Sequence, residues 1–341
     1  LTQRMLATQE TGTGAMGQIS LLLKAVIATS LTMEALLAAV FLPRFLSMGI
    51  DPVRAVWDAV FMAISVFNNA GFVILPEGLS PHVTDWWMLI PIILGTTVGA
   101  IGFPVIMDVA KNLRTPRRWR LHTKLTLSTY LILAFVGALA LALTEWNNPA
   151  TLGAIDTPSK ILNAMLAGVN SRSSGLSALD VGAMQTQTHF VQDILMMIGG
   201  GSASTAGGVK VTTFAVLVLA VIAEARGDRD IETFGRRIPT SAVRLAVAVS
   251  LLGLALVAVS VVLLLSMTNY SLDIILFETA SAFATVGLST GITPILPVGA
   301  KYVLIFLMFA GRTGSMTVAA ALALRERSRV IRMPEERPII G

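Results

Sequence analysis

The 341 residues are 54% hydrophobic and only 13% charged, and their mean hydropathy is +0.75. A soluble domain carries about 25% charged residues, so this composition excludes an ordinary soluble protein and predicts a membrane protein. The net charge of +5 comes from basic residues in short loops and does not indicate nucleic-acid binding, and the absence of cysteine excludes disulfides and thiolate metal sites.

Six stretches are long and apolar enough to cross a bilayer, which takes about 20 helical residues. They run along the chain as three pairs: Ile19 to Leu42 with Trp86 to Ala110, Leu125 to Leu143 with Val191 to Ala223, and Val243 to Met267 with Tyr302 to Leu324. Glycines interrupt the fourth stretch. We therefore expect an all-α polytopic membrane protein.

A shorter segment lies between the two members of each pair. These segments are Val53 to Phe67, Pro158 to Val169 and Leu272 to Phe283. As helices they would span about 18 to 23 Å, which is too short to cross. We interpret them as re-entrant pore helices, so that each unit consists of a membrane helix, a pore helix, an irregular turn and a second membrane helix. Irregular backbone at that depth is tolerated only where it is buried or lines a wet cavity.

One short phrase follows each pore helix: FNNAGF at 67–72, SRSSGL at 171–176 and FATVGL at 283–288. Their glycines, Gly71, Gly175 and Gly287, lie 104 and 112 residues apart, which indicates an internal repeat. Glycine adopts the conformations that a carbonyl-lined strand needs, and such strands replace the water around a cation. A tight turn or close helix packing explains a lone glycine more simply, but three copies in one context favour the carbonyl-lined path.

The second long stretch of the middle unit is unusually rich in glycine. Five glycines at positions 199–201, 207 and 208 are interleaved with serine and threonine. Each costs a helix interior about 1 kcal/mol relative to alanine, so we expect a loop. Close packing of small residues between helices is the alternative. A phosphate-binding loop is disfavoured because Val209 separates Gly208 from Lys210.

Charged residues inside the membrane stretches and turns need partners or a wet cavity. We expect Arg172 to point away from a cation path and to support its turn from behind, with Glu278 as its candidate partner; a direct part in ion energetics is the alternative. Arg312 lies in the middle of the last stretch. It should face a wet cavity, or else bond to carbonyls of the broken helix. Lys210 either adds positive potential at that level or snorkels to the cytoplasm.

Most basic residues fall on one side of the predicted membrane, in the linkers 111–124 and 226–244 and the tail 325–337. This pattern places those segments in the cytoplasm, and the glycine turns then hang from the outer face. The basic loops set the topology and contact membrane lipids; docking of a cytosolic regulatory partner is the alternative. His82, His122 and His189 have no metal-ligand spacing, so we do not expect an enzyme.

The phrases FNNAGF, NSRSSGL, GGGSASTAGGVKVTTF, SAFATVGLSTGITP and AGRTGS together resemble the ion-translocating subunit of the Trk/Ktr/HKT superfamily of potassium transporters, closest to the bacterial Ktr membrane subunit. The resemblance spans essentially the whole chain. Members of that family carry four units of membrane helix, pore helix and membrane helix around a pseudo-fourfold pore. Three units are visible here, so the resemblance implies that the first is missing.

The resemblance also implies a potassium filter, since glycine at this position of each unit accompanies potassium preference in the family and serine in one unit accompanies sodium permeation. The residues that would bind K⁺ are Asn68, Asn69, Ala70, Gly71, Ser173, Ser174, Gly175, Ala284, Thr285, Val286 and Gly287. Below the filter it implies a gating loop, with Arg312 beside it as an electrostatic barrier. That loop comprises Gly199, Gly200, Gly201, Ser202, Ser204, Thr205, Gly207, Gly208 and Lys210.

The expected organisation follows the repeats. A cytoplasmic segment (1–16) precedes the second repeat (17–111) and the third repeat with its broken helix (112–225). A cytoplasmic loop (226–240), the fourth repeat (241–332) and a cytoplasmic tail (333–341) complete the chain.

We expect potassium uptake across the inner (cytoplasmic) membrane without a covalent cofactor. The resemblance implies Na⁺ as an activator, a membrane homodimer, and a cytosolic ring whose nucleotide-binding domains carry any nucleotide. A Trk-type or sodium-permeable relative is the alternative within the superfamily. A secondary transporter with alternating access, for which broken helices are also typical, is the alternative outside it.

Overall fold

The computed structural model describes residues 19–314, with side chains from Leu23 to Thr313, and this part of the chain is predominantly helical. Three helices are long: α2 (Ile19–Ser47), α6 (Leu121–Glu145) and α10 (Thr240–Met267). The shorter ones are α3 (Pro52–Phe67), α4 (Trp86–Ile101), α5 (Phe103–Lys111), α7 (Thr157–Asn170), α8 (Thr186–Met197), α9 (Val211–Arg226), α11 (Leu272–Ala284) and α12 (Val298–Phe309). A π-turn, η7 (Ala310–Gly314), continues α12, and a hairpin of β1 (Ile231–Thr233) and β2 (Arg236–Ile238) follows α9.

The long helices α2, α6 and α10 are apolar enough to cross a membrane. The second predicted span is not one straight helix, because α4 and α5 are bent by 96° at Gly102. Gly102 has a φ of +95°, and Pro104 follows in the first turn of α5. A side chain at Gly102 would lie 2.5 Å from the carbonyl oxygen of Ser202, so the bend brings the chain against the glycine-rich segment. The sixth predicted span is described only to residue 314.

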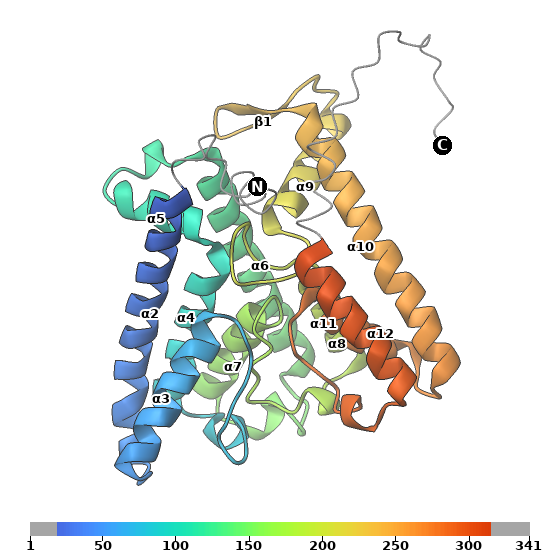
Figure 1. Cartoon of the computed structure of the whole chain (residues 1–341). Coiled ribbons are helices and arrows are strands. Elements are labelled where there is room, and N and C mark those ends of the chain that lie inside the picture. Colours follow the sequence, from blue (N-terminus) through green and yellow to red (C-terminus); the bar gives the residue numbers. More distant parts are fainter. Residues whose placement is uncertain (1–18, 315–341) are drawn as a thin grey trace.

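The three predicted short helices are confirmed as α3, α7 and α11. Two of them begin with the same signal: the Asp51 and Asp156 side chains accept hydrogen bonds from the first-turn amides, with a proline near each start. Such caps satisfy amides that have no partner inside the helix. Figure 1 shows α3 beside α2 and α12 beside α10, on opposite sides of the view.

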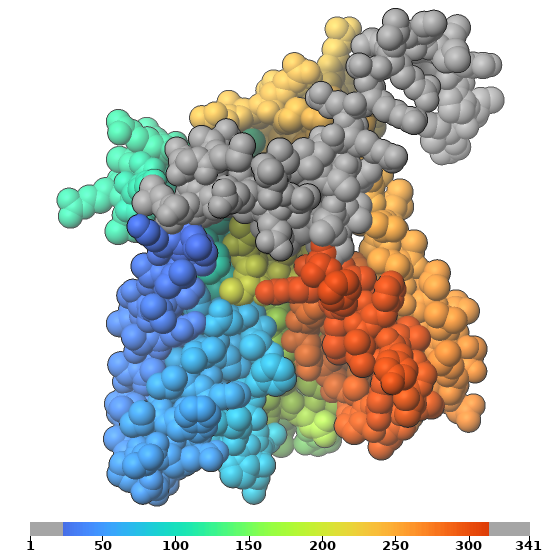
Figure 2. Space-filling view, viewed as in Figure 1, coloured from blue at the N-terminus to red at the C-terminus, as the bar shows by residue number. Residues whose placement is uncertain are grey.

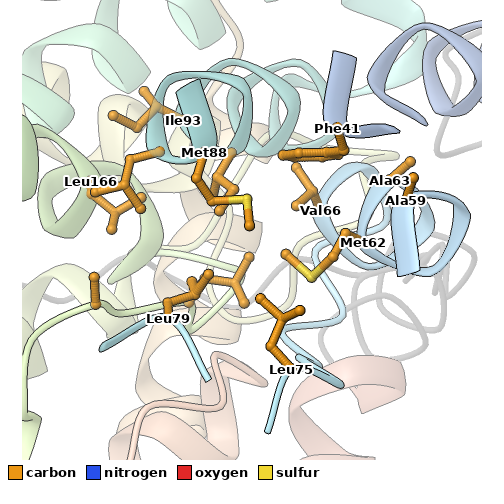
Figure 3. Packing of buried hydrophobic residues seen from close by; sticks show 14 of the residues in the cluster. Phe41, Ala59, Met62, Ala63, Val66, Leu75, Leu79, Met88, Ile93 and Leu166 are labelled. Atoms are coloured by element: carbon orange, nitrogen blue, oxygen red, sulfur yellow. The ribbon is translucent and has the colours of Figure 1, made fainter. Parts of the chain in front are cut away.

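The core between the first helices is closely packed. Met62 and Val66 of α3 meet Phe41 of α2 and Met88 of α4, and all four side chains are fully buried (Figure 3). Leu166 of α7 joins the same cluster. This packing fixes α3 and α7, and therefore the turns that follow them.

Apolar side chains also cover the outside. Leu251, Leu254 and Val262 on α10 are each more than half exposed, which suits a lipid environment rather than water. Figure 2 shows the surface hollowed between α3 and α12, so that more deeply placed parts of the chain are visible between them.

The hairpin was not predicted in the loop 226–240. Its strands have three residues each, and the two residues between them, Phe234 and Gly235, both have positive φ, as a type I′ turn requires. Ile231 and Ile238 pack against the ends of α6 and α9. The hairpin lies at the same end of the molecule as α5 (top in Figure 1). The predicted segments 1–16 and 333–341, and the basic tail, lie outside the described residues.

Helices α6 and α7 approach closely at Gly168. A Cβ there would lie 2.4 Å from the Ala134 carbonyl oxygen and 2.6 Å from the Ala138 amide nitrogen. Because both atoms belong to the backbone, the clash with an added Cβ can be relieved only by moving one helix.

Gly168→Ala should lower the free energy of unfolding by about 1–3 kcal/mol, because overpacking forces backbone shifts. Gly299→Ala is the matched control, since a Cβ on Gly299 meets only the Met267 sulfur at an ordinary 3.5 Å. The measurement is the melting temperature of each purified variant in detergent. Equal melting temperatures would contradict the inferred close contact.

Candidate functional site

One glycine after each short helix has a left-handed backbone conformation. Gly71, Gly175 and Gly287 have φ values of +76°, +64° and +96°, a region that other residues rarely adopt. Each follows a short helix, α3, α7 or α11, by a few residues. We call the segments 68–71, 173–175 and 284–287 the glycine turns.

The glycine turns lie directly against one another. A Cβ on Gly71 would be 2.2 Å from the carbonyl oxygen of Ser174, and one on Gly175 would be 2.3 Å from the carbonyl oxygen of Val286. Glycine is therefore required at both positions, because a side chain would disfavour the positive φ and would also clash with the carbonyl of the next turn. On the far side of the third turn, a Cβ on Gly287 meets no described atom within 4 Å. The turns thus form an arc of backbone carbonyls in which the Val286 carbonyl oxygen also lies 3.7 Å from the Cβ position of Gly71, while the space beside Gly287 is open.

A polar side chain of each short helix braces the turn that follows it. In all three units it donates a hydrogen bond of 2.6–2.7 Å to the carbonyl of the residue directly after the glycine. The pairs are Ser65 with Phe72, Asn170 with Leu176, and Ser281 with Leu288. These residues were not predicted, although the sequence carries a signal for them, a polar residue five or six positions before each glycine.

The predicted residues of the first turn face different surroundings. Asn68 is half-buried and donates to Glu34 Oε1 of α2 at 2.7 Å, whereas Asn69 is buried. Ala70 is exposed. In the other two turns Ser173, Ser174, Ala284 and Val286 are buried.

Arg172 does not pair with Glu278, so that prediction is wrong. The Arg172 guanidinium is fully buried and lies 3.6 Å from the centroid of the Tyr130 ring, a cation–π contact with α6. Glu278 instead accepts hydrogen bonds from Ser289, Thr290 and Thr293 at 2.7–2.9 Å. Arg172 thus contacts α6, whereas Glu278 binds the segment that follows the third glycine turn.

The predicted glycine-rich loop is present between α8 and α9, and we call it the loop 198–210. Its backbone bonds to the groups that the α4–α5 bend leaves free: Gly201 N donates to Ala100 O at 2.7 Å, and Phe103 N donates to Ala203 O at 3.2 Å. The loop also reaches the third glycine turn, since a Cβ on Gly207 would lie 2.6 Å from Ala284 O. Small residues are needed because backbone packs on backbone.

One residue of this loop contacts all three units. Thr205 Oγ1 accepts from Asn69 Nδ2 at 2.6 Å and donates to Gly99 O at 3.0 Å. Its carbonyl oxygen accepts from the Arg312 guanidinium, and Asn69 Oδ1 accepts from Ser173 Oγ at 2.8 Å. Arg312 is therefore placed next to the loop, as expected.

Lys210 ends the loop and donates to Ala206 O at 2.6 Å. The two residues are only four positions apart, so this bond closes the loop on itself. It holds the ammonium group next to the loop backbone.

No group of three or more histidine, aspartate or glutamate side chains suited to a metal ion occurs among the residues that the structure describes.

Comparison with known proteins agrees with this arrangement. A profile of the family described as TrkH, cation transport protein, matches residues 1–331. Ktr system potassium uptake protein B of Bacillus subtilis is 36% identical over 341 residues, which cover 100% of this chain and 76% of that protein. The protein of the same name from Vibrio alginolyticus is 32% identical, with 100% and 75% covered.

Potassium/sodium uptake protein NtpJ of Enterococcus hirae is 33% identical over 89% of this chain and 67% of its own length. Among solved structures, the potassium transporter TrkH from Vibrio parahaemolyticus superposes with a TM-score of 0.71 at 18% identity, over 92% of this chain. This chain spans 66% of that protein's length. The structural match shows a shared fold.

Gly175→Ala should disturb the arc of carbonyls, because its Cβ would displace the Val286 carbonyl. The matched control is Gly78→Ala: Gly78 has the same φ of +64° but no described atom within 4 Å of its Cβ. We expect an at least tenfold loss of cation discrimination in transport assays for Gly175→Ala alone, about the effect of 1.4 kcal/mol. Equal effects of both variants would show that backbone strain, and not the contact between turns, matters.

Proposed function

Because the chain belongs to the TrkH family of cation transport proteins, we propose that it conducts potassium ions across a membrane through the glycine turns. The observation that carries this proposal is the contact between turns, in which the Ser174 and Val286 carbonyls lie against Gly71 and Gly175. Carbonyl oxygens around a common axis can replace the water around K⁺. The names of two relatives, potassium uptake protein B, support the choice of ion.

In this proposal the glycine turns form the selectivity filter. The braces from Ser65, Asn170 and Ser281 hold the carbonyl directly after each turn in place, so that the filter keeps its width. Arg172 supports the middle turn from behind and does not bind the ion. Its stacking on Tyr130 keeps the positive charge off the path.

We propose that a fourth unit, beyond the three in this chain, closes the arc into a pseudo-fourfold pore. The open side of Gly287 and the hollow between α3 and α12 in Figure 2 support its position. The apolar side chains of Val56, Trp57 and Val60 on α3 are exposed in this chain. A further unit would bury such surfaces.

The loop 198–210 and Arg312 would form the gate on the cytoplasmic side of the filter. The loop contacts the base of the turns through Thr205 and Gly207. Arg312 places a positive charge beside it, bonded to the Thr205 carbonyl. A cation leaving the filter would meet both a steric and an electrostatic barrier.

The regulation we propose follows the names of the relatives, which are parts of a Ktr system. A cytosolic ring with nucleotide-binding domains would dock at the basic end, where Lys111, Arg114 and Arg117 are exposed, and the membrane subunit would form a homodimer. Na⁺ would act as an activator. The same basic end would face the cytoplasm and its anionic lipids.

A sodium-permeable transporter is the second candidate, favoured by the relative named potassium/sodium uptake protein. The three glycines at equivalent positions favour potassium over this alternative.

Rubidium uptake into vesicles that carry the full-length protein tests the function. We expect potassium to block uptake and an equal concentration of sodium to leave most of it intact. Equal block by both ions would favour the sodium-permeable alternative. Carrier-type exchange with no steady conductance would contradict a pore.

Arg312→Gln should raise rubidium flux by roughly tenfold or more, because it removes both the positive charge and a charge-assisted hydrogen bond. Lys301→Gln serves as a control: Lys301 also donates to a carbonyl, that of Pro294, but lies in the outer part of α12. A flux for Arg312→Gln equal to that of the control would argue against a barrier at this position.

A further inference from the structure

Three polar residues occupy one repeat position, two residues before each filter glycine. They are Asn69, Ser173 and Thr285. Ser173 Oγ donates to Asn69 Oδ1 at 2.8 Å, and Asn69 Nδ2 donates to Thr205 Oγ1 at 2.6 Å. The Asn69 amide therefore bonds two filter turns and the gating loop at once.

This contact is buried and strained. The exposed fractions of Asn69 and Ser173 are 6% and 1%, so losing a partner would leave a buried polar group unsatisfied. Asn69 and Thr285 have φ values of +52° and +50°. Such conformations in residues with side chains persist only where the surroundings hold them. For Asn69, the surroundings that stabilise this conformation include the Thr205 hydroxyl, which accepts its hydrogen bond.

We propose that Asn69 and Thr205 form a latch that couples the gating loop to the cytoplasmic entrance of the filter. The inference rests on the filter and the gate proposed above. With the loop in place, Thr205 fixes the Asn69 amide, and Asn69 fixes the Ser173 hydroxyl. When the loop moves away, both side chains at the filter entrance are released.

Through the latch, one equilibrium between the closed and the open loop controls both gating and selectivity. A change that weakens the latch favours the open loop and loosens the filter entrance together. Because such coupling is reciprocal, an ion that orders the filter entrance also stabilises the closed loop. Thr205 is thus a positioning residue, which acts on the ion path through Asn69.

The test uses full-length protein in vesicles and has two readouts. The first is rubidium flux, and the second is the block ratio, which is the block of rubidium uptake by potassium divided by that by sodium. Thr205→Val removes the hydroxyl at nearly constant shape, and Thr205→Ser retains it. Thr205→Val loses the hydrogen bonds to both Asn69 and Gly99 O, so we expect it to raise flux by at least the roughly two- to tenfold that one lost hydrogen bond gives, and to lower the block ratio at least twofold. Thr205→Ser should restore both values.

A double-mutant cycle identifies the partner. Asn69→Ala combined with Thr205→Val should change flux by less than the sum of the single changes, because both substitutions remove the shared hydrogen bond between Asn69 and Thr205. The control is Thr212→Val, which removes the 3.1 Å contact between Thr212 and Ser202 within the same region but away from the filter. It should leave the block ratio at the wild-type value.

Several outcomes would overturn the latch. Higher flux with an unchanged block ratio for Thr205→Val would leave a gate without coupling, and additive effects in the cycle would exclude direct contact. If Thr205→Val fails to fold, Asn69→Ala alone must still raise flux for the latch to stand. A wild-type protein without potassium-blocked uptake would instead refute the proposed function itself.

Discussion

Backbone groups that leave a helix inside a membrane must find partners within the protein, and this requirement organises the centre of the molecule. The α4–α5 bend and the loop 198–210 satisfy each other, through Gly201 with Ala100 and Phe103 with Ala203. The glycine turns are held in the same way by side chains of the helices before them. Small residues occur where one backbone must touch another. Each irregular segment is therefore stable only beside its neighbours.

Two carboxylates, Glu278 and Glu145, hold loops of the scaffold. Glu278 is surrounded by hydroxyl and amide donors, and Glu145 at the end of α6 accepts from Thr151, Thr188 and Gln185 in the outer loops. Saturated carboxylates of this kind hold loops in place and have little capacity left for an ion. The proposed path thus depends on neutral oxygen ligands, which bind a cation weakly enough to release it.

The sequence predicted those features that depend on local chemistry. Segment length predicted the short helix α7, and clustered glycines predicted the loop 198–210. Features that depend on distant residues could not be predicted. The partner of Arg172 is an aromatic ring 42 positions earlier, and Glu278 is satisfied by uncharged donors, so charge pairing suggested the wrong pair. The bend at Gly102 packs against a loop a hundred residues later in the chain, a contact that no local pattern indicates.

The three braces are alike but not identical, since two units use serine and the middle unit uses asparagine. All three braces belong to a single polypeptide. In a channel assembled from identical subunits, one codon change alters every side of the ion path at once. In this chain a single substitution changes only one side of the proposed ion path. Natural variation can therefore alter the path one side at a time.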